Sequence, residues 1–300
     1  QNPKPETLYI CKLMADTNRF QAIISHCKEY GFIFPSSEIY DGLSAVYDYG
    51  QWGSELKKNI RDYWWKTMTQ YHENIVGIDA AIFMHPTTWK ASGHVDNFND
   101  PMIDNKDSKK RYRVDHLIEG HADALRSAGK TAEADALLAE MDKLLAKDDL
   151  AGLKKLIEDN KIKCSISGTS NWTDVRQFNL MFSTQLGSVS DEASEIYLRP
   201  ETAQGIFVNF LNVQKTGRMK IPFGIAQTGK AFRNEIVARQ FIFRMREFEQ
   251  MEMQFFIRPG TQKQWYEYWK EERMRWHLSL GIPKEKYRFH DHIKLAHYAD

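Results

Sequence analysis

A segment in the last third of the chain carries side chains that could handle phosphate groups. Residues 246–256 (REFEQMEMQFF) alternate like a β-strand, in which successive side chains point to opposite faces. The stretch just before it, residues 216–246, holds seven Lys or Arg residues and a single acid, Glu235. One face of the strand would carry an arginine, an aromatic ring, an amide and a carboxylate: Arg246, Phe248, Gln250 and Glu252.

This combination suits the binding of a nucleoside triphosphate. The guanidinium of an arginine can donate two parallel hydrogen bonds to phosphate oxygens. An aromatic ring can stack on a base, and carboxylates are ligands for Mg²⁺. The basic stretch would form a loop over the strand face. The same pattern also fits a solvated strand face beside a basic loop, and the spacing alone does not decide between the two.

The elements predicted around this segment mix helices and strands without a regular order. Helices are indicated over residues 16–30, 53–73, 200–215 and 261–280, with Pro200 at the first position of the third. Strands are expected over residues 78–84, 221–227 and 246–257. The last two strands form a predicted hairpin. This favours an α+β fold with a mainly antiparallel sheet flanked by helices over a doubly wound parallel sheet.

Residues 96–165 differ in composition and are predicted to be an inserted segment. Its first part, 96–113, is expected to be a polar connector, in which the basic run 106–113 is the better candidate for RNA contact by charge. Residues 114–160 are rich in Ala, Leu and charged residues and contain no aromatic side chain. We expect them to be largely helical, with a turn at Gly129 or at residues 148–152.

Composition narrows the classes of protein to which the chain can belong. With 300 residues, 42% hydrophobic and 27% charged, it can bury the cores of about two domains. The formal net charge of +1 gives no sign of a nucleic-acid or membrane partner. No apolar run approaches the roughly 20 residues of a membrane-spanning helix. Three cysteines fit no disulfide framework, and with no visible signal peptide they predict a cytoplasmic protein without membrane contact.

Several segments resemble a known family. Phe232-Arg233-Asn234-Glu235, followed by Arg244 and Phe248, resembles motif 2 of the class II aminoacyl-tRNA synthetases. Further segments are similar to glycyl-tRNA synthetases of the homodimeric type, and they follow the family's order from about residue 28 to the end of the chain. These segments are 34–50 (FPSSEIYDGLSAVYDYG), 112–119 (YRVDHLIE), 171–182 (NWTDVRQFNLMF), 197–210 (YLRPETAQGIFVNF), 229–235 (GKAFRNE), 246–256 and 295–299 (LAHYA).

The resemblance implies a class II catalytic core and the two-step ligation of glycine to tRNA(Gly). Glycine would react with ATP, in the presence of Mg²⁺, to give glycyl-adenylate, and the glycyl group would then pass to the 3′ end of the tRNA. The family works as a homodimer. Residues 1–95, with motif 1, and 166–300, with motif 2, would belong to the catalytic domain. Motif 3 and an anticodon-binding domain are expected beyond residue 300.

Four residues around motif 2 take ATP-binding roles from the resemblance. Arg233 would bridge the α-phosphate of ATP and the carboxylate of glycine, and so stabilise the pentavalent transition state. Arg244 would hold the β- and γ-phosphates of a bent ATP. Phe248 would stack on adenine. Glu235 would accept a hydrogen bond from the adenine amino group or from the acceptor end of the tRNA.

Three further residues complete the implied site. Glu201 would pair with the α-ammonium group of glycine; it also fits a plain structural role, as a carboxylate that the helix dipole favours just after Pro200. Glu252 is the acidic strand position at which such enzymes meet Mg²⁺. Gln250, or a residue beyond 300, could take that place instead.

The segment 53–86 resembles motif 1, which builds the dimer interface of this class. We therefore expect Pro86 and Trp64 at a subunit interface. The alternative is an ordinary core helix. Because Trp64 and Trp65 are adjacent, they point to different faces of a helix and cannot both enter one core stripe.

The chain departs from the family at a metal site. Relatives often carry four zinc-binding cysteines beside the insertion. The corresponding positions here hold Asn105, Ser108, Cys164 and Ser167. A single thiol cannot form a structural zinc site, which needs about four ligands, so we predict that no zinc binds there.

Two other functions stay open at this stage. A non-catalytic relative could keep the fold as a nucleic-acid-binding or dimerisation module, but it would have no reason to retain Glu201 and the motif 2 residues together. A class II ligase for another small amino acid would look much the same, because a missing or extra methylene is worth only about 1–3 kcal/mol in binding.

Overall fold

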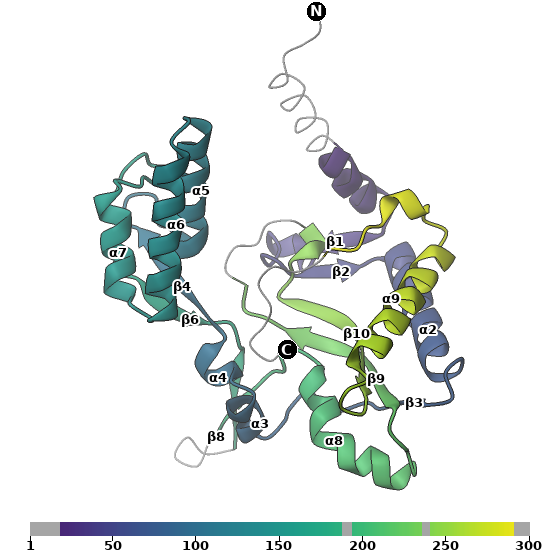
Figure 1. Cartoon of the computed structure of the whole chain (residues 1–300). Helices are drawn as coiled ribbons and strands as arrows, with labels where there is room; N and C mark the ends of the chain where they lie inside the picture. Colours follow the sequence, from purple (N-terminus) through teal and green to yellow (C-terminus); the bar gives the residue numbers. More distant parts are fainter. Residues whose placement is uncertain (1–18, 188–193, 236–240, 291–300) are drawn as a thin grey trace, which may run out of the picture.

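The computed structural model describes residues 19–187, 194–235 and 241–290. Two parts are visible in Figure 1: a core built around one mixed sheet, and an insertion whose helices stand apart from that sheet. Within the described residues, the chain has no helix with the length and apolar character that a membrane span requires. The first residues of the helix expected over 16–30, the cysteine Cys11 and the segment 295–299 lie outside these ranges.

The centre of the core is a long hairpin. Strand β9 (Phe223–Phe232) pairs with β10 (Glu247–Phe256) in antiparallel register, so that Phe248 lies opposite Ala231. The predicted hairpin is therefore confirmed, with β9 five residues longer at its end than expected. On the other edge of β9, the short strand β3 (Ile75–Gly77) runs parallel to it.

Helices cover both faces of the hairpin (Figure 1). One face packs on α2 (Gln51–Thr69) and α9 (Gln262–Ser279), through a cluster that includes Met253 and Phe255. The other face packs on α8 (Ala203–Thr216) through Ile206 and Phe256. The alternation predicted for residues 246–256 thus places odd-numbered and even-numbered side chains against different helices.

The prediction of a strand over residues 78–84 is wrong. Pairing with β9 instead selects Ile75–Gly77, where Ile75 is buried in the core. Gly77 is needed at the end of this strand because a Cβ there would lie 2.3 Å from the ring of Trp65. The segment after the strand is tied down by a side chain, since Nη1 of the buried Arg199 donates to the Ala80 carbonyl at 2.7 Å.

One residue of helix α2, Trp64, was expected at a subunit interface and lies elsewhere. Trp64 is only 5% exposed and packs inside this chain's own core with Met68 and Trp276. The neighbouring Trp65 points in another direction and packs against Gly77. Both tryptophans are therefore used internally, and the exposed tryptophan of α2 is Trp52, at 62%.

Pro200 is not the first residue of its helix. Helix α8 begins at Ala203 with Thr202 as its N-cap, so Pro200 lies outside it. The carbonyl group of Pro200 accepts a hydrogen bond from Nε of Arg233 at 3.1 Å. The proline turn therefore contacts motif 2 instead of starting the helix.

The insertion has its own sheet and its own core. The prediction of a polar connector over residues 96–113 is wrong, because the segment forms strands β4 (Asn99–Asn105) and β5 (Lys110–Arg113). The many charged residues of this segment suggested a loop, but they suit the exposed side of a strand pair. Arg111 pairs with Asp104 across the two strands, while Ile103 is buried. Strand β6 (Arg176–Asn179) pairs with the other edge of β4, which carries this unit past residue 165.

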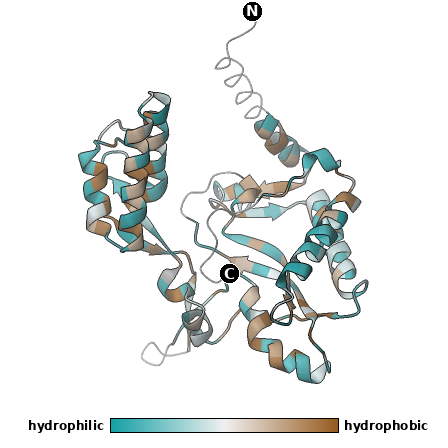
Figure 2. Ribbon diagram, viewed as in Figure 1, coloured by the Kyte–Doolittle hydropathy of each residue, from teal (hydrophilic) through white to brown (hydrophobic). Residues whose placement is uncertain are grey.

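Three helices close the insertion: α5 (Val114–Ser127), α6 (Thr131–Ala146) and α7 (Leu150–Asp159). Turns therefore lie at Gly129 and at residues 147–149, close to both expected positions. Hydrophobic and hydrophilic residues alternate along these helices in Figure 2. The hydrophobic ones form a cluster that includes Ile118, Leu137 and Ile157.

Shorter elements connect these units. They are β1 (Ile33–Pro35), the 3₁₀ helix Glu38–Tyr40, β2 (Tyr47–Tyr49), α3 (Pro86–Ala91), α4 (His94–Asn97), β7 (Ser183–Leu186), β8 (Ser194–Tyr197) and the 3₁₀ helices Phe241–Phe243 and Lys284–Lys286. Residues 19–29 are also helical, as predicted. All described strand pairs except β3–β9 are antiparallel.

Candidate active site

A cavity of about 400 Å³ lies where β10 begins, between α2 and the residues that follow β9. Four residues with predicted ATP-binding roles line it: Arg233, Glu235, Arg244 and Phe248. The hairpin register explains this convergence, because the Arg233 amide donates to the Arg246 carbonyl at 2.9 Å and so extends the strand pairing. The middle of the expected basic loop, residues 236–240, lies outside the described part of the chain.

The guanidinium of Arg233 lies between two aromatic rings. Its Cζ is 5.5 Å from the ring centre of Phe98 and 5.4 Å from that of Phe248. Both distances fall within the range of cation–π attraction. Nε is bound to Pro200, and within the described residues no further hydrogen bond of this guanidinium is found. The two terminal nitrogens are therefore left for a ligand, held in a fixed orientation.

Glu235 and Arg244 form an ion pair with each other. Nε of Arg244 donates to Oε2 of Glu235 at 2.7 Å, and the glutamate is only 7% exposed. Nε of Arg246 donates to the Glu235 carbonyl at 3.0 Å. A buried carboxylate needs such a partner. The sequence predicted separate contacts of these two residues with ATP, whereas here the pair also sets their mutual position.

Gln250 and Glu252 join the sheet to the start of α8. Oε1 of Gln250 accepts from the Thr202 amide at 3.2 Å. The carboxylate of Glu252 accepts from the Thr202 hydroxyl and, at 2.7 Å, from Nε2 of Gln254. Among the described residues no group of three or more His, Cys, Asp or Glu side chains is arranged for a metal. The Mg²⁺ role of Glu252 thus stays a prediction.

Glu201 lies just before α8, on the same side as Arg233. Its Oε1 is 3.3 Å from Nε2 of His94. Burial raises the pKa of Glu201, but hydrogen bonds from His94 and Gln204 and the charge of Arg233 together hold that pKa below its ordinary value. Glu201 therefore stays ionised, as a partner for an ammonium group must.

Sequence reasoning missed two residues where the chain enters the insertion, His94 and Phe98. They lie beside Glu201 and Arg233, which are more than 100 positions further along the chain. No periodicity or motif in a single sequence marks such a contact.

A lysine of helix α2 was also missed. Lys57 lines the cavity, and its Nζ binds Oε2 of Glu249 at 2.7 Å. Its Nζ also lies 4.5 Å from the ring centre of Tyr49. Burial and the nearby carboxylate of Glu249 raise the pKa of that tyrosine. Lys57 thus adds a cation beside the two arginines of motif 2.

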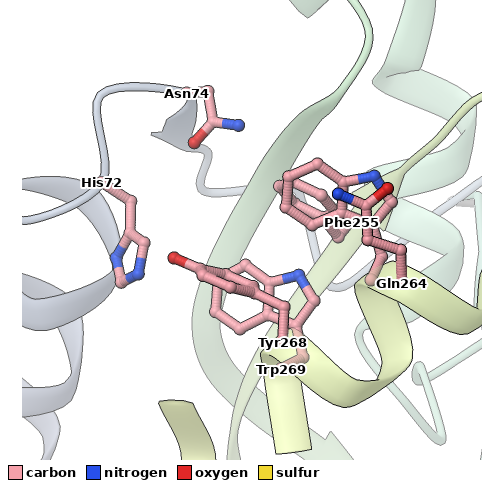
Figure 3. Close-up of a pocket in the computed structure, with 7 residues that line it drawn as sticks. His72, Asn74, Phe255, Gln264, Tyr268 and Trp269 are labelled. Carbon is pink, nitrogen blue, oxygen red and sulfur yellow. The ribbon is translucent and has the colours of Figure 1, made fainter. Parts of the chain in front are cut away.

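A second cavity, of about 200 Å³, lies toward the other end of β10, between Phe255 and helix α9 (Figure 3). In Figure 3 the ring of His72 and the hydroxyl group of Tyr268 point toward each other across it. Nδ1 of His72 lies 2.8 Å from the Thr67 carbonyl. None of the predicted site residues lines this cavity, so it is separate from the candidate active site.

The four positions of the family's zinc site meet in two matching turns. In one turn, the Ser108 amide donates to Oδ1 of Asn105 at 2.9 Å. In the other, the amides of Ile166 and Ser167 donate to Sγ of Cys164 at 3.4 and 3.5 Å. The turns are joined by Ser167 Oγ donating to Asn105 Oδ1 at 2.9 Å, and by Ser108 Oγ lying 3.3 Å from Cys164 Sγ.

Hydrogen bonds thus occupy the place of the metal, and we call this cluster the Asn105–Cys164 crosslink. Burial raises the pKa of Cys164, but the hydrogen bonds to its sulfur outweigh that effect and lower it to about 6. One thiol, one amide and two hydroxyl groups are not a zinc donor set. The residues do not fit the metal that the family's site would hold.

Because the four positions converge, three substitutions should create a zinc site. We expect the variant Asn105→Cys/Ser108→Cys/Ser167→Cys to bind one zinc ion per chain, measured by titration with a chromophoric chelator and by the thiolate absorption of its cobalt form. Adding Cys164→Ser to this variant should weaken binding strongly. For the unsubstituted chain, thermal unfolding should be the same with and without a chelator. A triple variant that binds no metal would contradict the described placement of the turns.

Sequence comparison agrees with this geometry. Residues 182–300 match the family described as tRNA synthetase class II core domain (G, H, P, S and T). Residues 100–134 and 126–180 match glycyl-tRNA synthetase insertion domain 1. The fold and the motif 2 cavity therefore define a class II aminoacyl-tRNA synthetase core with its helical insertion.

Three individual relatives all belong to one kind of class II synthetase. The chain is 59% identical over 280 residues to a glycine--tRNA ligase of Chlorobaculum tepidum, covering 93% of this chain and 60% of the relative. The enzymes of the same name from Macrococcus caseolyticus and Geobacillus thermodenitrificans are 51% and 52% identical, covering 96% and 93% of this chain and 60% and 58% of the relatives. The chain belongs to the glycyl-tRNA synthetase family, and it spans about 60% of the length of these relatives.

Proposed function

We propose that the protein containing this chain activates glycine with ATP and transfers the glycyl group to tRNA(Gly). The observation that carries this proposal is the cavity that gathers Arg233, Glu235, Arg244 and Phe248, with Glu201 beside Arg233. A module that only binds nucleic acid would have no need to hold an ionised carboxylate next to an arginine whose terminal nitrogens are left for a ligand. The close relatives named glycine--tRNA ligase support the same reaction.

The first step needs positioning and charge neutralisation more than proton transfer. The carboxylate of glycine is already a nucleophile at neutral pH. One of its oxygens attacks the α-phosphorus of ATP in line, the bond from that phosphorus to the bridging oxygen breaks, and pyrophosphate leaves. Arg233, fixed between two rings, would bind the α-phosphate and the incoming carboxylate together. Arg244 and Lys57 would face the leaving pyrophosphate.

Glycine itself would lie between opposite charges. Its ammonium group would bind Glu201 and its carboxylate would bind Arg233, and the electrostatic link between these two residues supports their sharing one small ligand. In the second step, the terminal ribose hydroxyl of the tRNA attacks the carbonyl carbon of the adenylate and AMP leaves.

Further parts of the proposal concern partners and location. Mg²⁺ would accompany ATP, with Glu252 or Gln250 on the strand below it. The protein would act as a homodimer in the cytoplasm, where its tRNA is used. Pro86, half-buried at the first position of α3, stays a candidate for the subunit interface, while Trp64 does not.

The deciding experiment is ATP–pyrophosphate exchange by the whole protein. We expect exchange that depends on glycine and is lower by about tenfold to two-hundredfold or more with alanine or serine, because a methyl group must be excluded from the site. Equal exchange with alanine would indicate a ligase for another small amino acid. No exchange with any amino acid would favour a non-catalytic module and defeat the proposal.

A further inference from the structure

The short segment between α3 and β4 brings side chains to both ends of the proposed glycine site. His94 opens helix α4, and its ring packs against Trp89 and Phe98, with ring centres 5.5 and 5.4 Å apart. Trp89 is fully buried, so the imidazole is held in one place. This packing points the ring at Glu201.

Hydrogen bonds fix both nitrogens of the His94 ring. Nδ1 lies 2.9 Å from the hydroxyl oxygen of Ser92, and that hydroxyl is also 3.2 Å from the Trp89 carbonyl. Nε2 lies 3.3 Å from Oε1 of Glu201. An ionised carboxylate can only accept a hydrogen bond, so Nε2 carries the proton in this contact.

Three neighbouring side chains lower the pKa of Glu201. Its pKa responds to His94 from α4, to Gln204 from α8 and to Arg233 from the segment after β9. His94 and Gln204 donate hydrogen bonds, and Arg233 supplies a positive charge. Removing one donor would let the carboxylate rotate and would raise its pKa.

The same segment also touches the other charged group of the site. Phe98, one helical turn beyond His94, lies under the guanidinium of Arg233. One short piece of chain therefore contacts the residue proposed to bind the ammonium of glycine and the residue proposed to bind its carboxylate.

We infer that His94 is a positioning residue for glycine, which orients the carboxylate of Glu201, with Phe98 holding Arg233 in the matching place. This inference rests on the proposed function, because it assigns glycine to Glu201. His94 touches neither glycine nor ATP. Its effect passes through the direction and the charge of Glu201.

The test compares His94→Ala with His94→Gln in glycine-dependent ATP–pyrophosphate exchange by the whole protein. The side-chain amide of glutamine can replace the Nε2 donor. We expect His94→Ala to raise the KM for glycine by about tenfold to a hundredfold, the range for losing a hydrogen bond to a charged group, and to leave the KM for ATP unchanged. His94→Gln should restore most of the lost affinity.

The pH profile separates positioning from a general structural role. Glu201 with a raised pKa would be protonated at higher pH, so in His94→Ala the acid limb of kcat/KM for glycine should move to higher pH. Ser92→Ala keeps the imidazole but removes its hydrogen-bond partner. It should raise the KM for glycine and move the acid limb to higher pH, in both cases by less than His94→Ala does. The exposed His116, replaced by alanine on α5, is the matched control and should change nothing.

Each outcome bears on one claim. Wild-type protein without glycine-dependent exchange would defeat the proposed function. Active wild-type protein, combined with a His94→Ala variant whose KM for glycine and acid limb are unchanged, would overturn this inference alone. A fall in kcat without a change in KM, not rescued by glutamine, would also overturn it.

Discussion

Replacing Arg233 with alanine is expected to lower glycine-dependent ATP–pyrophosphate exchange by about a thousandfold or more. This is the range found when a single arginine or oxyanion donor is removed from a phosphoryl-transfer or acyl-transfer transition state. The guanidinium lies between the rings of Phe98 and Phe248 with its two terminal nitrogens left for a ligand. In the proposed reaction those nitrogens bind both the α-phosphate and the attacking carboxylate, so no other described residue can replace them.

Two further variants test the reason for this loss. Arg233→Lys keeps a positive charge but loses the planar fork, so it should recover only a small part of the activity. Arg258→Ala, at an exposed position beyond β10, is the matched control and should exchange normally. The unfolding temperature of Arg233→Ala should stay within a few degrees of wild type, because two cation–π contacts and one hydrogen bond contribute only about 1–3 kcal/mol together. Near-normal exchange by Arg233→Ala would remove the central support of the proposed mechanism.

Replacing Glu201 with glutamine is the second large effect that we expect. The KM for glycine should rise by about thirtyfold to a thousandfold, which corresponds to the roughly 2–4 kcal/mol lost when a desolvated charge pair loses one partner. The KM for ATP should stay the same, because the proposed ATP contacts lie on motif 2. Separate titrations of glycine and ATP in the exchange assay measure the two constants.

The pH dependence gives this variant a second readout. The pKa of Glu201 is lowered, so in wild type the carboxylate is ionised at neutral pH and kcat/KM for glycine falls only as the pH drops through that lowered pKa. Glutamine cannot titrate, and the limb due to this residue should vanish. Glu119→Gln, at an exposed position on α5, should leave the limb in place. A limb that survives in Glu201→Gln belongs to another group and would argue against the ammonium role.

Much of the core of the site could be predicted because it depends on local regularities. The alternation of residues 246–256 placed Phe248, Gln250 and Glu252 on one face, and the antiparallel register then brought the end of β9 beside them. Motif 2 supplied Arg233 and Glu235 at that end. These relations follow from the period of a strand and from one hairpin, both of which a sequence displays.

The failures arose where distant contacts decide the structure. His94 and Phe98 belong to the site only because the base of the insertion folds back on α8 and β9, and no spacing signals it. The strand at β3 was misplaced because pairing with β9 prevailed over an apolar run. Pro200 was misplaced because its carbonyl binds Arg233 before the helix begins.

The Asn105–Cys164 crosslink has a consequence for how this protein is made. Its donors and acceptors are all part of the chain, so the two turns can close without any bound ion. In a cell short of transition metals, this part of the insertion would still fold. The closing of these two turns therefore does not depend on the zinc supply.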